Sequence, residues 1–405
     1  TSHEGSCVNT GGNTSLVLRL GTAQTLAWGS TYYLPAILAR PMADGLGLPV
    51  SQVWWAFTLA MLLSAALGPF AGRAIDRWGG RPVLAGTSVL FALGLGTLAL
   101  AQGPVSLLAG WLVIGLAMGA GLYEAAFAAL VRLQGHGARG AITGITLLAG
   151  FASTVGWPLS GWMDAEFGWR GACAGWAALH LLLGLPLNAS LPRAAALPPP
   201  EASPAVHEPA ADATAVSPAP PYVAWVLAYV FAATWFTSTA MAAHLPALLM
   251  AGGMTLAGAL GVGALIGPAQ VAGRLLEFGW LRRLHPLLSA RLASIGHPVG
   301  VLVWMAAGAV AAPVFAVLHG LGNGILTIAK GTLPLVFFGP VGYGQRQGWI
   351  MAPSRVAQAF APLVFGALIE RFGAQALWFS AGLCTSAALC LLGLRAVSAP
   401  ASGQR

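Results

Sequence analysis

FAGRAIDRWGGRP, residues 70–82, lies between two long apolar runs of the sequence. It holds four charged residues, Arg73, Asp76, Arg77 and Arg81, in a chain of which only 7% is charged. Charged segments between apolar runs are typical of places where a chain passes through water between two membrane helices. The stretch therefore predicts a loop at a membrane surface.

The composition indicates a membrane protein. Of 405 residues, 57% are hydrophobic, and the mean hydropathy is +0.76. Soluble domains carry about a quarter charged residues, so this chain cannot cover a globule with polar side chains. The net charge of +8 does not indicate nucleic-acid binding, because the arginines are scattered singly between apolar runs.

The cysteines indicate neither a zinc site nor a disulfide framework. Cys7, Cys173, Cys384 and Cys390 form no CxxC pair, and three of them lie in apolar segments. No nucleotide-binding GxxxxGK[ST] loop is present, so ATP is not expected to drive the protein directly. We expect no cofactor and no metal site.

Apolar runs long enough to cross a bilayer recur along the chain. About 20 apolar residues form a helix that spans the hydrocarbon layer, and these runs are too long for barrel strands. We therefore expect an all-α membrane protein with twelve transmembrane helices. The predicted spans, numbered in chain order, are 17–40, 52–72, 83–102, 105–130, 140–163, 171–191, 222–249, 256–279, 287–309, 311–337, 345–369 and 373–396.

A proline-rich segment divides the spans six and six. Residues 192–221 contain nine prolines and three acids, which is typical of a linker without regular structure. The predicted parts are a polar N-terminal tail (1–16), a first six-helix bundle (17–191), a cytoplasmic linker (192–221), a second six-helix bundle (222–396) and a C-terminal tail (397–405).

The arginines predict the orientation, because basic residues concentrate on the cytoplasmic side. With both termini in the cytoplasm, only Arg40, Arg170 and Arg371 fall on the opposite side. The cytoplasmic set is Arg73, Arg77, Arg81, Arg132, Arg139, Arg193, Arg282, Arg283, Arg291, Arg346, Arg395 and Arg405. The predicted location is a plasma membrane, the inner membrane of a bacterium.

The two halves repeat each other at an offset near 205 residues. YLPAILA (33–39) resembles HLPALLM (244–250), and GRAID (72–76) resembles GRLLE (273–277). GLAMGAGLYEAA (115–126) aligns in the same order with GLGNGILTIAKG (320–331). These matches predict two parallel six-helix repeats that bind a ligand between them and rock about it.

Residues 72–81 resemble the loop between helices 2 and 3 of the major facilitator superfamily. That motif has a Gly, three residues, Asp-Arg, one residue, a Gly and two basic residues. Gly72, Asp76, Arg77, Gly79 and Arg81 match it, while Gly80 replaces one basic residue. The resemblance implies a cytoplasmic charge latch that opens as the halves rock. The alternative is an ordinary basic loop.

Three charged residues fall inside predicted spans. Glu124 lies in span 4, Lys330 (the only lysine) in span 10 and Arg355 in span 11. Charges at this depth are costly unless they are paired or hydrated, so they are candidates for function. We expect Lys330 and Arg355 to bind substrate and Glu124 to carry a proton. The alternative is that these residues form ion pairs that only hold helices together.

Arg274 and Glu277 align with Arg73 and Asp76 in the repeat. They predict a second latch, with substrate contact as the alternative. His244 replaces Tyr33 in the repeat and is either a proton carrier or a core histidine bonded to a carbonyl. His319 and His180 are interpreted as packing residues.

The resemblance also implies which helices surround the cavity. In the superfamily these are helices 1, 4, 7 and 10. The predicted substrate-binding residues are Tyr32, Tyr33, His244, Asn323, Lys330 and Arg355.

Together these features predict a secondary active transporter rather than an enzyme. Excess positive charge in the membrane favours a small organic anion, such as a monocarboxylate, driven by a proton or exchange gradient. The chain broadly resembles the monocarboxylate and oxalate–formate exchanger branch. Lipid and protons are the other expected partners, and we expect a monomer.

Other functions are left open. Proton-coupled efflux of hydrophobic drugs would suit an acid in an aromatic-rich cavity. Soft-metal transport would use Met250 and Met254. A membrane enzyme would need clustered catalytic groups, and a sensor would need a sizeable soluble domain. The sequence indicates neither.

Overall fold

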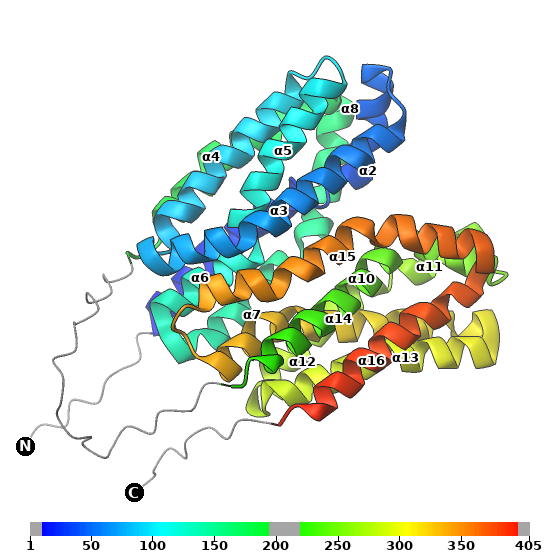
Figure 1. The fold of residues 1–405 in the computed structure, drawn as a ribbon. Coiled ribbons are helices and arrows are strands. Elements are labelled where there is room, and N and C mark those ends of the chain that lie inside the picture. Colours follow the sequence, from blue (N-terminus) through cyan, green and yellow to red (C-terminus); the bar gives the residue numbers. More distant parts are fainter. Residues whose placement is uncertain (1–9, 194–218, 396–405) are drawn as a thin grey trace, which may run out of the picture.

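The computed structural model describes residues 10–193 and 219–395 (Figure 1). These residues form α-helices joined by short turns and contain no β-strand, which confirms the all-α fold. Cys7, most of the predicted N-terminal tail and linker, and the whole predicted C-terminal tail lie outside them.

Nine α-helices make up the described part of the first half. They are α1 (Thr10–Gly29), α2 (Pro35–Leu46), α3 (Val50–Trp78), α4 (Gly80–Ala99), α5 (Pro104–Gly121), α6 (Tyr123–Gln134), α7 (Ala138–Ala149), α8 (Ala152–Leu179) and α9 (Leu185–Ala189). The described part of the second half has seven. They are α10 (Tyr222–Ala251), α11 (Leu256–Gly263), α12 (Ile266–Gly279), α13 (Pro286–Ala307), α14 (Ala312–Phe338), α15 (Tyr343–Phe372) and α16 (Leu377–Gly393).

Each of the twelve predicted spans is helical, although several ends differ. Within the described ranges, six helical stretches are long and apolar enough to cross a membrane. They are Val50–Trp78, Gly80–Ala99, Pro104–Ala189, Tyr222–Ala251, Pro286–Phe338 and Tyr343–Gly393, and the longer ones contain two or three predicted spans. Spans 1 and 8 are not among them, and each is interrupted, span 1 between α1 and α2 and span 8 between α11 and α12. Helix α1 begins at Thr10, earlier than predicted.

Two further interruptions shape the interior. Leu122 has an extended backbone between α5 and α6, so span 4 is broken and Glu124 lies in the first turn of α6. A carboxylate is stabilised at a helix N-terminus by the helix dipole. Gly168, with φ +69°, separates the two parts of α8 that belong to spans 5 and 6. A positive φ suits glycine because it has no Cβ.

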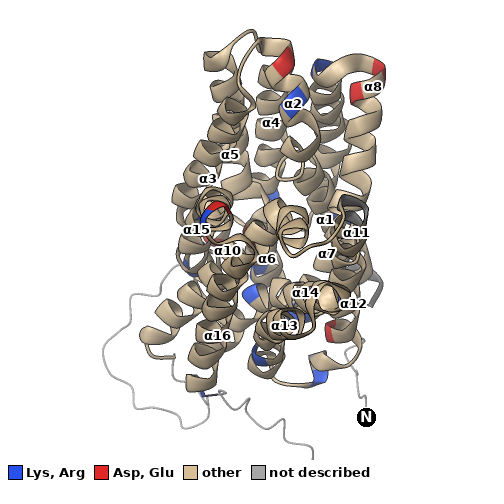
Figure 2. Ribbon diagram, turned by 90° about the vertical axis from the view of Figure 1, so that its right-hand side faces the viewer, with Lys and Arg blue, Asp and Glu red and all other residues tan. Residues whose placement is uncertain are grey.

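The helices form two halves, each with its own apolar core. One core cluster draws almost entirely on residues 16–191, and two others lie between residues 223 and 394. In Figure 1 the halves converge near α6 and α7 and separate toward α2, α8 and α11. Figure 2 shows how few charged positions the ribbons carry. We call the end with Asp76, Arg139, Glu277 and Gly344 the latch end, and the other the far end.

Helices α3 and α15 cross in very close contact near the latch end. A Cβ at Gly72 would collide with the backbone carbonyl of Gly344. A Cβ at Gly348 would likewise collide with the backbone of Pro69. The glycine that begins the sequence motif is therefore required by backbone contact between the two halves.

This crossing predicts that Gly72→Leu destabilises the protein. Overpacking a tight contact costs about 1–3 kcal/mol, so the unfolding temperature of the purified protein should fall. Gly86→Leu is the matched control, because Gly86 on α4 is exposed and a Cβ there meets nothing within 4 Å. Equal unfolding temperatures for the two variants would contradict the close crossing.

Candidate functional site

A cavity of about 1380 Å³ lies between the two halves. Its walls come from α3, α8, α10, α12, α14 and α15 together with the turn between α1 and α2. Exposed Trp54, Trp55 and Trp157 line it, whereas none of Asp76, Arg139, Glu277 or Gly344 does. The cavity therefore belongs to the far end.

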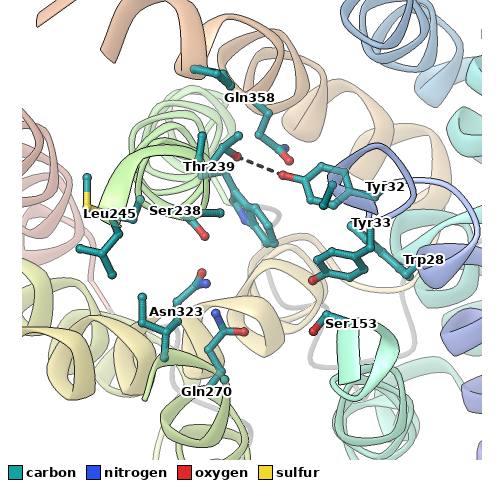
Figure 3. A pocket seen from close by; sticks show the side chains of 18 of the residues that line it. Trp28, Tyr32, Tyr33, Ser153, Ser238, Thr239, Leu245, Gln270, Asn323 and Gln358 are labelled. Carbon is teal, nitrogen blue, oxygen red and sulfur yellow. Dashed lines mark hydrogen bonds between the residues drawn. The ribbon is translucent and has the colours of Figure 1, made fainter. Parts of the chain in front are cut away.

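Polar side chains from both halves surround the hollow (Figure 3). The Tyr32 hydroxyl is 3.3 Å from the Thr239 hydroxyl, and this contact joins the halves across the cavity. The remaining polar groups labelled in Figure 3 are those of Tyr33, Ser153, Ser238, Gln270, Asn323 and Gln358. Tyr32, Tyr33 and Asn323, which the sequence analysis predicted to bind substrate, thus line the cavity.

Aromatic rings form the floor of the cavity. Trp28, Tyr123 and Trp235 all line it, and the ring centroids of Trp28 and Tyr123 are 4.9 Å apart. The Trp28 ring also packs edge-on against Tyr32, with centroids 5.3 Å apart. The floor is therefore apolar and closely packed.

Arg274 on α12 is the one charged residue among those that line the cavity in the described structure. It is only 6% exposed, and its Nε and Nη1 atoms have no hydrogen-bond partner among the described residues. The guanidinium reaches the other half, where a Cβ on Gly150 would collide with it. Of the two interpretations of Arg274, this position favours substrate contact.

A buried charge network lies beneath the aromatic floor. The Lys330 Nζ atom donates to the Glu124 Oε1 atom at 3.2 Å, and the Arg355 guanidinium donates to the other carboxylate oxygen. Glu124 belongs to the first half, and both cations belong to the second. The network is therefore an ionic bridge between the halves, and we call it the triad.

Aromatic rings also surround the lysine of the triad. The Lys330 Nζ atom is 4.3 Å from the ring centroid of Trp235, 5.0 Å from that of Tyr123 and 5.9 Å from that of Trp28. Lys330 is 2% exposed, and no member of the triad lines the cavity. The sequence-predicted charges are brought together, but the floor separates them from the cavity.

The residues of the sequence motif connect the halves at the latch end. The Asp76 carboxylate accepts hydrogen bonds from the backbone N–H groups of Gly344 and Gln345, both at 2.9 Å. These N–H groups belong to the first turn of α15, where a carboxylate is stabilised by the helix dipole. Gly79, with φ +81°, provides the tight turn between α3 and α4.

The basic residues Arg77 and Arg81 of the motif take no part in these contacts of Asp76. Arg77 lies over the ring of Trp78, and neither Arg77 nor Arg81 forms an ion pair within the described ranges. The latch is therefore built from the Asp76 carboxylate and backbone amides.

Glu277 makes the corresponding contact in the second half. Its Oε1 atom is 2.9 Å from the Arg139 Nη2 atom on α7, in the other half. Arg139 also donates to the Leu284 carbonyl at 3.1 Å. Two contacts between the halves, one from each repeat, thus close the latch end.

Two histidines take up packing positions. The His244 Nε2 atom is 2.7 Å from the Pro362 carbonyl oxygen, and His244 is not among the cavity-lining residues. This placement favours the alternative of a core histidine bonded to a carbonyl. His180 bonds the Ser30 hydroxyl at 2.7 Å and stacks on Phe91, as a packing residue would.

Several cavity residues were not identified from sequence. His319, expected to be a packing residue, lines the cavity one turn from Asn323 on α14, and Thr327 follows one turn later. The i, i+4, i+8 spacing of these polar residues in an apolar helix was the available signal. Gln270 and Gln358 also line the cavity and belong to no motif that the sequence analysis considered.

The residues considered for soft-metal transport are not gathered at the cavity. Met250 and Met254 are not among its lining residues, and Met254 packs against an apolar core. Among the residues that the structure describes, no group of three or more His, Cys, Asp or Glu side chains could hold a metal ion.

Comparisons with known proteins give a family and a fold. The sequence model of the Major Facilitator Superfamily matches residues 20–316. Two Mycobacterium tuberculosis proteins (strains CDC 1551 / Oshkosh and ATCC 25618 / H37Rv), each called Multidrug resistance protein B homolog, are 33% identical over 177 residues. That match covers 43% of this chain and 31% of the relatives, so the chain matches less than a third of their length.

Two solved structures share the fold over nearly the whole chain. The human organic anion transporter MFSD10 has a TM-score of 0.69 at 16% identity, covering 94% of this chain and 99% of that one. The proton:xylose symporter XylE, bound to 6-bromo-6-deoxy-D-glucose, has a TM-score of 0.73 at 12% identity, covering 95% and 96%.

The triad predicts strong coupling between Glu124 and Lys330. Glu124→Gln leaves two buried cations without a carboxylate, so it should lower the unfolding temperature markedly; losing one partner of a buried pair costs about 3–5 kcal/mol. Adding Lys330→Met to Glu124→Gln should recover part of this loss.

The measurement is a double-mutant cycle on thermal unfolding, with Lys330→Met alone as the control. A coupling free energy of about 0.5–3 kcal/mol is expected for residues in one network. Additive losses from the two substitutions would show that the two side chains do not interact.

Proposed function

Because the chain belongs to the Major Facilitator Superfamily, whose members are multi-pass membrane transporters and not enzymes, we propose that it is a secondary active transporter of organic monocarboxylates with an apolar body. Small-molecule transport follows from the family. The substrate class and the coupling are our inference from the cavity.

The buried guanidinium of Arg274 carries the proposal. A buried charge without hydrogen-bond partners is costly, and a carboxylate would supply both the opposite charge and two acceptor oxygens. Arginine binds carboxylates through two parallel hydrogen bonds, which also fixes the orientation of the ligand. The substrate carboxylate is therefore expected at Arg274, in the deep part of the cavity.

The rest of the cavity supports an apolar substrate body. Its volume exceeds the roughly 300–1,000 Å³ of common ligand sites, and a short monocarboxylate would leave most of it unfilled. Trp28, Trp235 and Tyr123 offer flat rings against which a hydrophobic or aromatic body could pack. The M. tuberculosis relatives are named for multidrug resistance and the human protein for organic anion transport, and an organic anion with an apolar body agrees with both names.

Transport requires the two halves to rock. We place the latch end in the cytoplasm, because the arginines concentrate there, with both termini on the same side of a plasma membrane. This conformation then faces outward. A change to the inward-facing conformation breaks the hydrogen bonds of Asp76 to α15 and the Glu277–Arg139 ion pair. All of these contacts lie within one chain, so we propose that the protein works as a monomer.

Glu124 is the proposed coupling residue. In this conformation its carboxylate accepts hydrogen bonds from Lys330 and Arg355 of the other half, and these two cations stabilise the ionised form. When the halves part at the latch end, the carboxylate loses both cations. Binding a proton removes the charge that would otherwise stay unpaired inside the membrane. Glu124 would therefore be protonated in one conformation and paired in the other.

Efflux of hydrophobic drugs is the second candidate. The aromatic walls and the multidrug-resistance names of the M. tuberculosis relatives favour it. A drug transporter would accept neutral or cationic aromatic compounds as readily as anions, whereas the unpaired Arg274 favours anions. The charge of the preferred ligand distinguishes the two.

We predict that Arg274→Gln weakens binding of an aromatic monocarboxylate such as 2-naphthoate. A hydrogen bond to a charged group contributes about 1.5–3 kcal/mol, so its loss should raise the Kd roughly 10- to 100-fold. The Kd is measured by thermal shift or calorimetry on the purified protein. Arg283→Gln removes the same charge from an exposed site and should leave binding unchanged.

The amide of the same acid serves as the ligand control. We expect 2-naphthamide to bind the wild type far more weakly than 2-naphthoate. If the amide binds as tightly, or if Arg274→Gln has no effect, the anion proposal fails. Preferential binding of an aromatic cation instead would support drug efflux.

A further inference from the structure

Two histidines and a serine form a chain of hydrogen bonds that ends at the cavity wall. His319 on α14 and His297 on α13 are joined through their Nδ1 atoms at 3.0 Å, and both are 5% exposed. The His297 Nε2 atom is 3.0 Å from the Ser380 hydroxyl on α16. Of the three, only His319 lines the cavity.

The direction of each hydrogen bond follows from the serine. The Ser380 hydroxyl donates to the Leu377 carbonyl at 2.8 Å, so it accepts from the His297 Nε2–H group. A neutral imidazole has one N–H group, so the His297 Nδ1 atom must be an acceptor. The His319 Nδ1–H group therefore donates to it, and the His319 Nε2 atom carries a lone pair.

That lone pair is the free end of the chain. The structure gives the His319 Nε2 atom no hydrogen bond within the described residues, and it belongs to a side chain of the cavity wall. The Phe315 ring stacks on His319 with centroids 5.9 Å apart and also contacts His297, with centroids 5.4 Å apart. The ring pair is thus held rigidly, with one basic nitrogen left over.

Among the described residues, no carboxylate bonds to His319 or lines the cavity beside it. His297 is the titratable group in contact with His319, and Arg274 on α12 is the charged residue that shares the cavity wall with it. Several other titratable and charged side chains on the helices around α14 are engaged elsewhere. Glu124, Lys330 and Arg355 form the triad, Arg139 pairs with Glu277, and His244 bonds to Pro362.

We propose that His319, held by His297 and Ser380, is a proton-binding site that opens into the cavity and takes up one proton. The proton passes from the cavity to the His319 Nε2 atom, where an N–H bond forms and the ring becomes an imidazolium. A second proton is excluded, because the His297 Nδ1 lone pair already accepts from His319 and its Nε2 atom already carries a hydrogen.

His319 and Glu124 differ in whether a proton can reach them in this conformation. Glu124 is covered by the aromatic floor and bonded to two cations here, whereas His319 is reached from the cavity. An imidazolium at His319 adds positive charge to the wall that carries Arg274. If the proposed anion transport is right, a bound proton raises the affinity for the anion, and a bound anion raises the affinity for the proton by the same factor.

Nitrogen NMR on histidine-labelled protein in nanodiscs tests the site with the proton as the only ligand. In a titration from about pH 8 to pH 4, which extends below the ordinary range of imidazoles, we expect one imidazolium to appear from the coupled pair. It should disappear in His319→Gln and persist in His180→Gln, which alters a buried histidine in the other half. No imidazolium from the pair, two of them, or one that survives His319→Gln would overturn the proposal.

A second variant leaves both rings in place. Ser380→Ala removes the hydroxyl that accepts from the His297 ring. We expect both rings then to populate a mixture of the Nδ1–H and Nε2–H tautomers. Ser380→Thr keeps a hydroxyl and should restore the single tautomer of each ring. Unchanged tautomers in Ser380→Ala would overturn the relay. Because no substrate is added, these results are independent of whether the transported molecule is an anion.

Discussion

The bridge from Glu124 to Lys330 and Arg355 is the interaction on which the rest of the structure depends. Three charges buried in a membrane protein are tolerated only when they satisfy one another, and here the carboxylate and the cations come from opposite halves. The bridge therefore holds only while the halves are closed around it. The conformation with the cavity above it and a closed latch end below it is the one in which all three charges are paired.

The latch end is also held by contacts between the halves. Asp76 from the first repeat caps α15 of the second half, and Glu277 from the second repeat pairs with Arg139 of the first half. Both contacts lie near the bundle end, and the Glu277 carboxylate is as buried as the triad. In the proposed transport cycle, opening this end also separates the triad, so a proton or substrate that changes the charges near the triad would decide which end is open.

The sequence alone predicted the helices and the pairing of the halves better than the cavity itself. Long apolar runs define the spans, and the repeat placed Lys330 close to the position that corresponds to Glu124. The break at Leu122 could not be foreseen, because nothing local forces an extended residue there. The sequence left the role of Arg274 open and indicated only a packing position for His319, because the rotation of a helix about its axis depends on its neighbours and not on the local pattern. For His244 the sequence left two roles open, and its helix turns it toward Pro362 and away from the cavity lining.

The most direct test is the distance between the halves at the latch end. Spin labels at Trp78 and Leu284, both exposed and on opposite halves, report it by double electron–electron resonance in nanodiscs. The triad predicts one narrow, short distance in the otherwise unaltered protein and a second, longer population once Glu124→Gln removes the shared carboxylate. Identical distance distributions in the two proteins would contradict the claim that this buried bridge holds the halves together.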